Sequence, residues 1–281
     1  MKRTVSARAD ARTKALRRGI HAVLAGLFAF TLCGVLAAGP AAAQVPDGCS
    51  PLPPAPPMDF LAPPNLDLIK RQLVYYRCTP YDADIAAVLR DARQWVAERA
   101  PQVAKPGIVL DIDETSLSNW TRIYRDQFAY FVKGPCPLDG QGLCGDLEWQ
   151  RSEQAPAIGP TLDLYKFARC QEVAPPCRQV DVFFVTGRHE SDEAIDGKTP
   201  TQWTAENLAK AGYLGLSPDH LYLRRKGFPG PVEHFKTAAR TEIEQKFGVT
   251  IIANLGDQDS DLIGGHAERT FKLPNPFYFI P

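Results

Sequence analysis

Three carboxylates lie within four residues of the stretch VLDIDETSLSN, at positions 109–119. Asp111, Asp113 and Glu114 follow a short apolar run that fits a buried strand. An aspartate can attack a phosphoryl group and form an aspartyl phosphate, and a carboxyl two residues later can protonate a leaving oxygen and then activate water. Glu114 has no role that the sequence indicates, beyond favouring the start of a following helix, where negative charge is stabilised. The stretch therefore predicts one half of a phosphoryl-transfer site.

Polar residues also follow other apolar runs of the chain. Thr186 lies in FFVTGR, and Asp257 and Asp261 lie in NLGDQDSDL. Ligands of an open parallel sheet bind beyond the carboxyl ends of its strands, so we expect these residues to converge with Asp111. A single aspartate at a strand end is often a helix cap or a turn residue, so the prediction depends on the whole set. The acidic set offers only hard oxygen ligands, which suit Mg²⁺.

The elements that must position these residues alternate between strand and helix. Buried strands are predicted in GIVLDID, QVDVFFVTG, HLYLR and VTIIANLGD. Helical spacing of apolar residues occurs between them in TLDLYKFARC, PTQWTAENLAKAGY and VEHFKTAARTEIEQKFG, and before them in DLIKRQLVYYRC and YDADIAAVLRDARQWVAERA. This alternation predicts an α/β fold in which helices cover both faces of a parallel sheet.

The interval from Trp120 to Ala157 is too long for a simple connection between the first strand and the next helix. In WTRIYRDQFAYF the aromatic residues Trp120, Tyr124, Phe128 and Phe131 fall at the spacing of one helical stripe. The stripe either packs into the core or belongs to a cap whose aromatic rings contact the organic group of a substrate. We predict a small helical cap, built from this insertion at about residues 116–157 and from the N-terminal helices.

The four polar stretches together resemble the ordered motifs of the haloacid dehalogenase (HAD) superfamily. DIDETSLSN is similar to the first motif, FFVTGR to the second, and HFKTAARTEIEQKFGVTIIANLGDQDSDL to the third and fourth. The pattern resembles the acid phosphatase group that includes bacterial class C enzymes and plant vegetative storage proteins. TAENLAKAGY and the terminal FKLPNPFYFIP also fit that group. The resemblance covers residues 60 to 281 approximately, and it implies a Rossmann-like HAD fold.

The resemblance also implies a role for each matched residue. Asp111 is expected as the nucleophile and a Mg²⁺ ligand. Asp113 is expected as the general acid and base, with its backbone carbonyl on the metal. Thr186 and Lys236 are expected to hold the phosphoryl group. Some plant storage members lack the nucleophilic aspartate, and its presence at position 111 favours activity.

Other charged residues near these motifs have more than one interpretation. Asp257 is expected to ligate Mg²⁺, and Asp261 either ligates it or orients its waters. Lys226 in LRRKG competes for the role of the motif lysine, but we interpret this run as a solvated turn. Arg188 either meets phosphate or forms a structural salt bridge. His189, beside a turn, is interpreted as solvent-exposed.

The first residues of the chain predict export. MKRTVSARADARTKALRRG is basic, IHAVLAGLFAFTLCGVLAAG is apolar, and PAAAQ has Ala41 and Ala43 in an A-x-A arrangement. This order predicts a signal peptide at residues 1–43, cleaved after about Ala43, and a periplasmic or secreted protein. A retained membrane anchor is the alternative, because the apolar run nearly spans a bilayer. A proline-rich arm at 44–63 and the phosphatase domain at 64–281 follow.

Cysteine usage agrees with export. Six cysteines remain after the signal peptide, and an even number in an exported chain predicts disulfides. Many pairings are open to six cysteines, and the spacing suggests three local ones: Cys49–Cys78, Cys136–Cys144 and Cys170–Cys177. A zinc site is disfavoured, because no CxxC occurs and no histidine lies at ligand spacing.

The composition limits the class of function. The chain has 281 residues, of which 44% are hydrophobic, enough for one sizeable core or one domain with an insertion. Its 32 basic residues balance 32 acidic ones, which gives no support for binding a nucleic-acid polymer.

We predict a phosphoric monoester hydrolase, a Mg²⁺-dependent acid phosphatase that acts on small phosphomonoesters, with nucleotides among the candidates. No membrane association is expected after signal cleavage. The alternatives are a weakly active storage or binding protein on the same scaffold and a phosphotransferase. The sequence leaves the natural substrate and homo-oligomer formation open.

Overall fold

The computed structural model describes residues 45–51, 65–137, 140–171 and 177–280. The predicted signal peptide and most of the proline-rich arm lie outside these residues. Within the described ranges, no helix is both long and apolar enough to cross a membrane.

A five-stranded parallel sheet forms the centre of the described fold, with the strand order β5-β4-β1-β6-β7. The strands are β1 (Pro106–Leu110), β4 (Asp181–His189), β5 (Leu221–Arg224), β6 (Thr250–Gly256) and β7 (Thr270–Lys272). Four of them match the predicted strands. The edge strand β7 was not predicted, because its three residues are too few to give a periodic pattern. The strand before the acidic stretch, β1, lies in the middle of the sheet.

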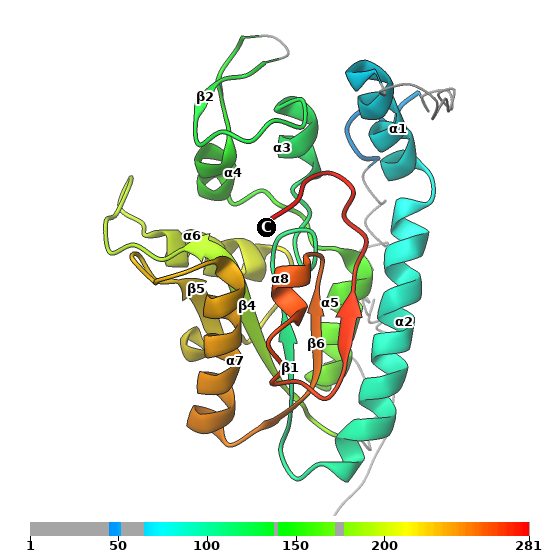
Figure 1. The fold of residues 1–281 in the computed structure, drawn as a ribbon, viewed down its shortest axis with the longest axis vertical. Coiled ribbons are helices and arrows are strands. Elements are labelled where there is room, and N and C mark those ends of the chain that lie inside the picture. The colour runs from blue at the N-terminus through cyan, green and yellow to red at the C-terminus, as the bar shows by residue number, and fades with distance from the viewer. Residues whose placement is uncertain (1–44, 52–64, 138–139, 172–176, 281) are drawn as a thin grey trace, which may run out of the picture. The chain divides into compact units, whose positions relative to one another are not determined.

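Helices cover both faces of this sheet, as predicted (Figure 1). Val109, Phe183 and Val185 alternate along β1 and β4 and pack with buried residues of α7 (Val232–Phe247). Their neighbours in the sequence point to the opposite face, where they pack with α2 (Tyr81–Arg99) and α5 (Gly159–Ala168). Burial on both faces explains why the central strands are continuous apolar runs rather than alternating ones.

Several further helices lie outside the cap insertion. They are α1 (Leu66–Cys78), α6 (Pro200–Lys210), α8 (Asp259–Leu262) and the 3₁₀ helices η1 (Ala100–Gln102) and η2 (Pro218–His220). The start of α6 follows from its sequence, because Thr199 and Gln202 form a capping box and Pro200 occupies the first turn.

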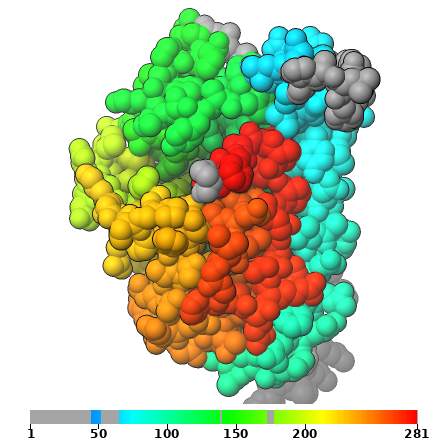
Figure 2. Space-filling view, viewed as in Figure 1, coloured from blue at the N-terminus to red at the C-terminus, as the bar shows by residue number. Residues whose placement is uncertain are grey.

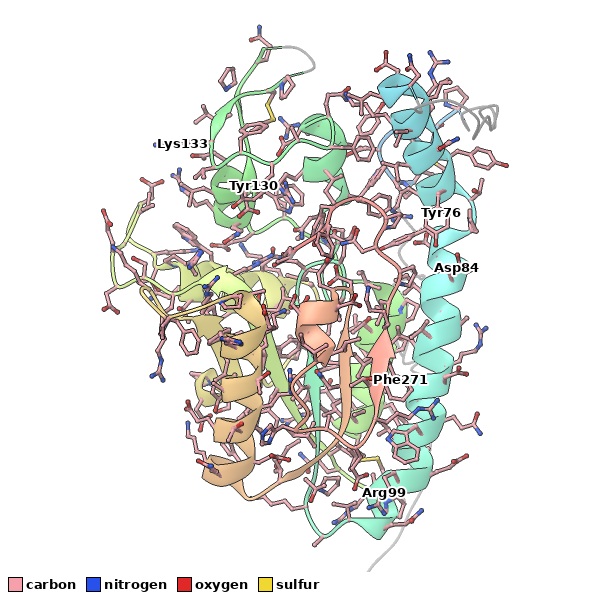
Figure 3. The ribbon with its side chains drawn as sticks, viewed as in Figure 1. Tyr76, Asp84, Arg99, Tyr130, Lys133 and Phe271 are labelled. Carbon is pink, nitrogen blue, oxygen red and sulfur yellow. A yellow bond between two sulfur atoms is a disulfide. The ribbon has the colours of Figure 1, made fainter. Side chains whose placement is uncertain are left out.

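The second N-terminal helix belongs to the core rather than to the cap. We expected the N-terminal helices to join the cap, but α2 contacts α5, β6 and β7. Its buried stripe, which includes Ile85, Leu89 and Val96, covers the sheet next to β7. Figure 3 shows Phe271 of β7 beside this helix. The apolar stripe of α2 predicts a buried face but does not say which surface covers it.

The insertion after β1 forms a small cap. It contains α3 (Trp120–Arg125), the antiparallel pair β2 (Gly134–Pro135) and β3 (Leu143–Cys144), and α4 (Asp146–Ser152). The prediction that the aromatic residues from Trp120 to Phe131 form one helical stripe is wrong, because α3 ends at Arg125 and both Gln127 and Phe128 have positive φ angles. The turn still brings the ring of Phe128 to 6.0 Å from that of Trp120, so the two aromatic residues meet through a turn instead of a helix.

The three suggested disulfides are confirmed. Cys49 bonds to Cys78, Cys136 to Cys144, and Cys170 to Cys177. The first bond ties residues of the N-terminal arm to the end of α1, and the second closes the cap hairpin. The indole nitrogen of Trp120 also donates to the backbone carbonyl of Asp47 (2.7 Å), which fixes this part of the arm against the cap.

Candidate active site

Asp111 lies where β1 ends, in the middle of the sheet. Its N–H donates to the carbonyl of Leu255 on β6 (3.0 Å), which extends the strand pairing by one hydrogen bond. The chain then turns sharply, since the N–H groups of Ser116 and Leu117 both donate to the carbonyl of Ile112 (2.8 Å each). The hydroxyl of Ser116 donates to the carbonyl of Asp111 (2.6 Å). These bonds hold the buried Asp111 side chain at the end of the central strand.

Three buried carboxylates and one buried lysine meet at this point. Carboxylate oxygens of Asp111, Asp257 and Asp261 lie within 4.8 Å of one another. Lys236 of α7 donates to Asp111 Oδ1 (2.6 Å) and also to Asp261 Oδ1. Burial alone lowers the pKa of Lys236, but the charges of both carboxylates outweigh it and hold this pKa above its ordinary value. One lysine cannot neutralise three carboxylates, so the cluster has an excess of negative charge.

This excess appears in the pKa values of the carboxyl groups. Burial raises the pKa of Asp111 well above its usual range, and the charge of Asp261 raises it further. Burial and Asp261 together raise the pKa of Asp257 to about 7. A hard divalent cation would relieve this repulsion, and oxygen-only ligands fit Mg²⁺. In the described part of the chain, no other cluster of three acidic, histidine or cysteine side chains has this geometry.

A glycine allows the last acid to approach. Gly256 ends β6, and a Cβ at this position would overlap the Cβ of Asp261. Asp261 Oδ2 also accepts the N–H of Gln258 (2.8 Å) at the start of α8. The short helix thus turns Asp261 back toward the sheet. The GDQDSDL sequence supplies both the glycine that leaves room for Asp261 and the Gln258 N–H that binds its carboxylate.

Asp113 faces a different partner. Its Oδ1 accepts hydrogen bonds from Arg188 Nη2 (2.7 Å) and from Asn119 Nδ2 (2.8 Å), and its Oδ2 accepts one from Arg188 Nε (3.1 Å). Burial opposes ionisation of Asp113, but Arg188 and Asn119 outweigh it and hold the pKa of Asp113 below its usual value. The salt-bridge interpretation of Arg188 is confirmed, and Arg188 also lines the pocket described below.

Glu114 is a buried residue whose hydrogen bonds hold the same loop in place. It is 1% exposed, and its carboxylate accepts the N–H of Asn119 (2.6 Å) and the hydroxyl of Tyr278 (2.7 Å). Burial raises its pKa to about 7. Asn119 precedes α3, so Glu114 does interact with the start of the following helix. No local pattern reveals its partner Tyr278, which lies 164 residues away.

Thr186 is the predicted site residue that lies deepest. It is fully buried, and β4 continues past it to His189 with a shift of register. Its hydroxyl accepts the N–H of Arg188 (3.1 Å), while Gly187, Arg188 and His189 line the pocket and Thr186 does not. The other predicted residues, by contrast, all line one pocket: Asp111, Asp113, Lys236, Asp257 and Asp261.

This pocket has a volume of about 620 Å³. Its floor is the charged cluster, and its walls include Phe128 and Tyr130 of the cap and Phe279 near the C-terminus. Figure 2 shows the C-terminal residues between the cap and the rest of the core, and Figure 3 shows Tyr130 on the cap. His189 is exposed, as expected, but it also lines the pocket. Lys226 lies in an exposed turn after β5, as expected.

Comparison with known proteins agrees with this fold. A family model described as HAD superfamily, subfamily IIIB (acid phosphatase) matches residues 65–281. The chain therefore belongs to this family of the HAD superfamily. A structure of the class C acid phosphatase from Bacillus anthracis shares the fold, with a TM-score of 0.55, 19% identity, and coverage of 75% of this chain and 86% of that one.

Curated relatives come from plants. Acid phosphatase 1 of Solanum lycopersicum is 33% identical over 178 residues, which cover 61% of this chain and 58% of the relative. The stem 28 kDa glycoprotein of Glycine max is 36% identical over 180 residues, covering 63% of this chain and 61% of the relative. Vegetative storage protein 1 of Arabidopsis thaliana is 28% identical over 174 residues, covering 62% and 55%. The chain thus aligns with little more than half the length of these relatives.

Proposed function

We propose that the protein is an exported Mg²⁺-dependent acid phosphatase that hydrolyses small phosphomonoesters through an aspartyl phosphate. The observation that carries this proposal is the meeting of Asp111, Asp257, Asp261 and Lys236 on the floor of an open pocket. Family membership supports it independently.

The proposed reaction has two steps. Asp111 attacks the phosphorus atom, the bond to the leaving oxygen breaks, and Asp113, in its protonated form, gives a proton to that oxygen and becomes a carboxylate. In the second step Asp113 takes a proton from a water molecule, and the water attacks the phosphorus atom of the aspartyl phosphate. The bond between phosphorus and Asp111 breaks, which releases phosphate and restores Asp111. Lys236 and the Thr186 segment hold the phosphoryl oxygens. Bound Mg²⁺, ligated by Asp111, Asp257, Asp261 and the carbonyl of Asp113, would supply positive charge toward the phosphate.

Turnover of p-nitrophenyl phosphate tests the proposal. Asp111→Asn should abolish the Mg²⁺-dependent activity, because an amide cannot act as the nucleophile, and EDTA should abolish the activity of the wild-type protein. Asp91→Asn, at an exposed position on α2, is the matched control and should keep full activity. Full activity of Asp111→Asn would show that another group attacks phosphorus.

The organic group of the substrate is proposed to be flat and apolar. Phe128, Tyr130 and Phe279 line the pocket, and the last two are 75% and 74% exposed, which leaves their rings free to contact a ligand. An aryl group or a nucleobase would fit these walls. A panel of aryl phosphates, nucleoside monophosphates and sugar phosphates should therefore give the lowest kcat/KM for the sugar phosphates.

A storage or binding function is the second candidate, because two relatives are named vegetative storage proteins. The two functions differ in turnover, which a storage protein lacks at any pH from mildly acidic to neutral. The complete set of proposed catalytic residues favours the phosphatase.

Export is proposed from the signal-like segment together with the three disulfides. Cleavage after Ala43 would give a mature protein that begins at Gln44. Mass spectrometry of the protein from the periplasm or medium tests this, and recovery of the uncleaved chain in the membrane fraction would favour the anchor instead.

A further inference from the structure

The end of the chain folds back over the candidate site and contacts both Asp257 and the loop that carries Asp113. We define the C-terminal segment as Leu273–Ile280. It leaves β7 and returns to a position beyond the carboxyl ends of the central strands (Figure 1). The N–H of Leu273 donates to the carbonyl of Gly256 (2.8 Å), which fixes the start of the segment beside Asp257. The reaction proposed above gives no task to its polar side chains.

One side chain of this segment holds the carboxylate of Asp257. Asn275 Nδ2 donates to Asp257 Oδ2 (2.7 Å), and Gln258 Nε2 donates to the same oxygen (2.7 Å). Two donors satisfy both lone pairs of Oδ2. Oδ1 accepts a single, longer bond from the hydroxyl of Thr115 (3.2 Å) and so keeps acceptor capacity. The two amides therefore fix the rotation of the carboxylate and leave Oδ1 for a cation.

Asn275 is itself held in place. Its Oδ1 accepts the N–H of Phe277 (2.9 Å), which requires the amide nitrogen to face Asp257. Phe277 is buried, and its ring centroid lies 5.1 Å from that of Trp120 and 5.2 Å from that of Tyr81. The aromatic contacts fix the backbone, and the backbone in turn fixes the amide.

A second side chain of the segment reaches the loop that carries Asp113. The hydroxyl of Tyr278 donates to Glu114 Oε2 (2.7 Å), and Glu114 Oε1 accepts the N–H of Asn119 (2.6 Å). Asn119 Nδ2 then donates to Asp113 Oδ1 (2.8 Å). A continuous chain of hydrogen bonds thus joins Tyr278 to Asp113.

We propose that the C-terminal segment is a positioning element of the active site. Asn275 orients Asp257 toward the divalent cation, and Tyr278 supports the loop that carries Asp113. The identity of the cation rests on the proposed function, and the roles of these two residues go beyond it. Groups that hydrogen-bond to metal ligands commonly contribute about 10- to 100-fold to metal affinity.

Calorimetric titration of the EDTA-treated, dialysed protein with Mg²⁺ tests the role of Asn275 without measuring activity. Asn275→Ala should bind Mg²⁺ about 10- to 100-fold more weakly than the wild type. Asn275→Ser keeps an oxygen near the Phe277 N–H but is too short to reach Asp257, so it should fold and show the same weakening. Asn65→Ala is the matched control, because Asn65 caps α1 and has no part in the site.

The outcomes separate the two proposals. Equal Mg²⁺ affinity of the wild type and both Asn275 variants overturns the role of Asn275 and leaves the proposed function intact. Failure of the wild type to bind Mg²⁺ overturns the metal dependence in the proposed function, and the role of Asn275 with it. Equal weakening in Asn65→Ala would mean that lost stability, rather than a lost hydrogen bond, is the cause.

Steady-state kinetics at saturating Mg²⁺ test the proposed role of Tyr278. Tyr278→Phe removes one hydroxyl and keeps the ring, so kcat should fall while KM stays near the wild-type value. Tyr165→Phe is the matched control, because its hydroxyl also makes one partly buried hydrogen bond, to the carbonyl of Leu214, and neither residue lines the pocket. An unchanged kcat in Tyr278→Phe overturns the proposed role of Tyr278.

Discussion

Arg188 and Asp113 form a forked ion pair that joins β4 to the loop after β1. Two nitrogens of the guanidinium donate to the two carboxylate oxygens, at 2.7 Å and 3.1 Å. The Arg188 side chain is 2% exposed and that of Asp113 is 27% exposed, so the pair lies at the pocket wall with one partner open to it. A planar guanidinium fixes the orientation of a carboxylate as well as its charge.

Replacing this arginine should affect stability. Arg188→Met leaves Asp113 with Asn119 as its remaining donor, and we expect a loss of about 1.5–3 kcal/mol in the free energy of unfolding, the usual contribution of a hydrogen bond to a charged group. Urea unfolding at neutral pH measures the loss. Arg90→Met, at an exposed position on α2, should change it by less than about 0.5 kcal/mol. Equal stability of the two variants would contradict a structural role for the ion pair.

The packing of α2 on the sheet gives a second prediction. Leu89 is 3% exposed within the core, so Leu89→Ala should lower the free energy of unfolding by about 2–5 kcal/mol through lost burial and a cavity. Leu66→Ala, at a residue that is 64% exposed, should have little effect. Thermal or urea unfolding compares them. A small effect at Leu89 would mean that α2 is not part of the cooperative core.

An ion pair at the far end of α2 predicts a pH dependence. Arg99 donates to both carboxylate oxygens of Glu268 (2.7 Å each), and these bonds lower the pKa of Glu268 below its ordinary 4.5. Figure 3 labels Arg99. The stability from this pair is present above pH 4.5 and is lost as the pH falls through the lowered pKa. Glu268→Gln should therefore be slightly less stable than the wild type at pH 7, and the difference should shrink as the pH falls below 4.5. A difference that stays constant through the acidic range would point to a cause other than the charge.

The disulfides should contribute unequally to stability. Cys49–Cys78 closes a sequence separation of 29 residues and Cys170–Cys177 one of 7. Loop entropy then predicts losses of about 3.5 and about 2.5 kcal/mol when each pair is replaced by serine. Urea unfolding of the two double variants measures both values, and peptide mapping checks the pairings. A larger loss for the shorter loop would indicate that native contacts, rather than chain entropy, decide the order.

Local sequence patterns were sufficient to predict much of the fold. Burial on both faces of the central strands requires continuous apolar runs, and helices on each face require apolar residues at helical spacing, so both signals can be read from short stretches. The parallel sheet follows from their alternation. The same alternation places Asp111 and Asp257 at one edge of the sheet, since parallel strands end on the same side.

Local patterns failed where the backbone depends on distant contacts. The aromatic residues from Trp120 onward identify the face that packs together, but they do not determine that α3 ends at Arg125. The chain turns there through left-handed positions at Gln127 and Phe128, and the aromatic contact survives the turn. Periodicity constrains which side chains are buried, and it leaves the path between them open.

By itself, the sequence determined the class of fold and the acids that form the candidate site, and its cysteine spacing suggested the disulfide pairs that the structure confirms. These depend on residue types, spacing and strand order. Only the tertiary structure decided which groups hold those acids: Arg188 on Asp113, Tyr278 on Glu114 and Asn275 on Asp257. The reason is physical, because a hydrogen bond has a range of about 3 Å and depends on direction. Partners separated by as many as 164 residues leave no periodic trace in the sequence.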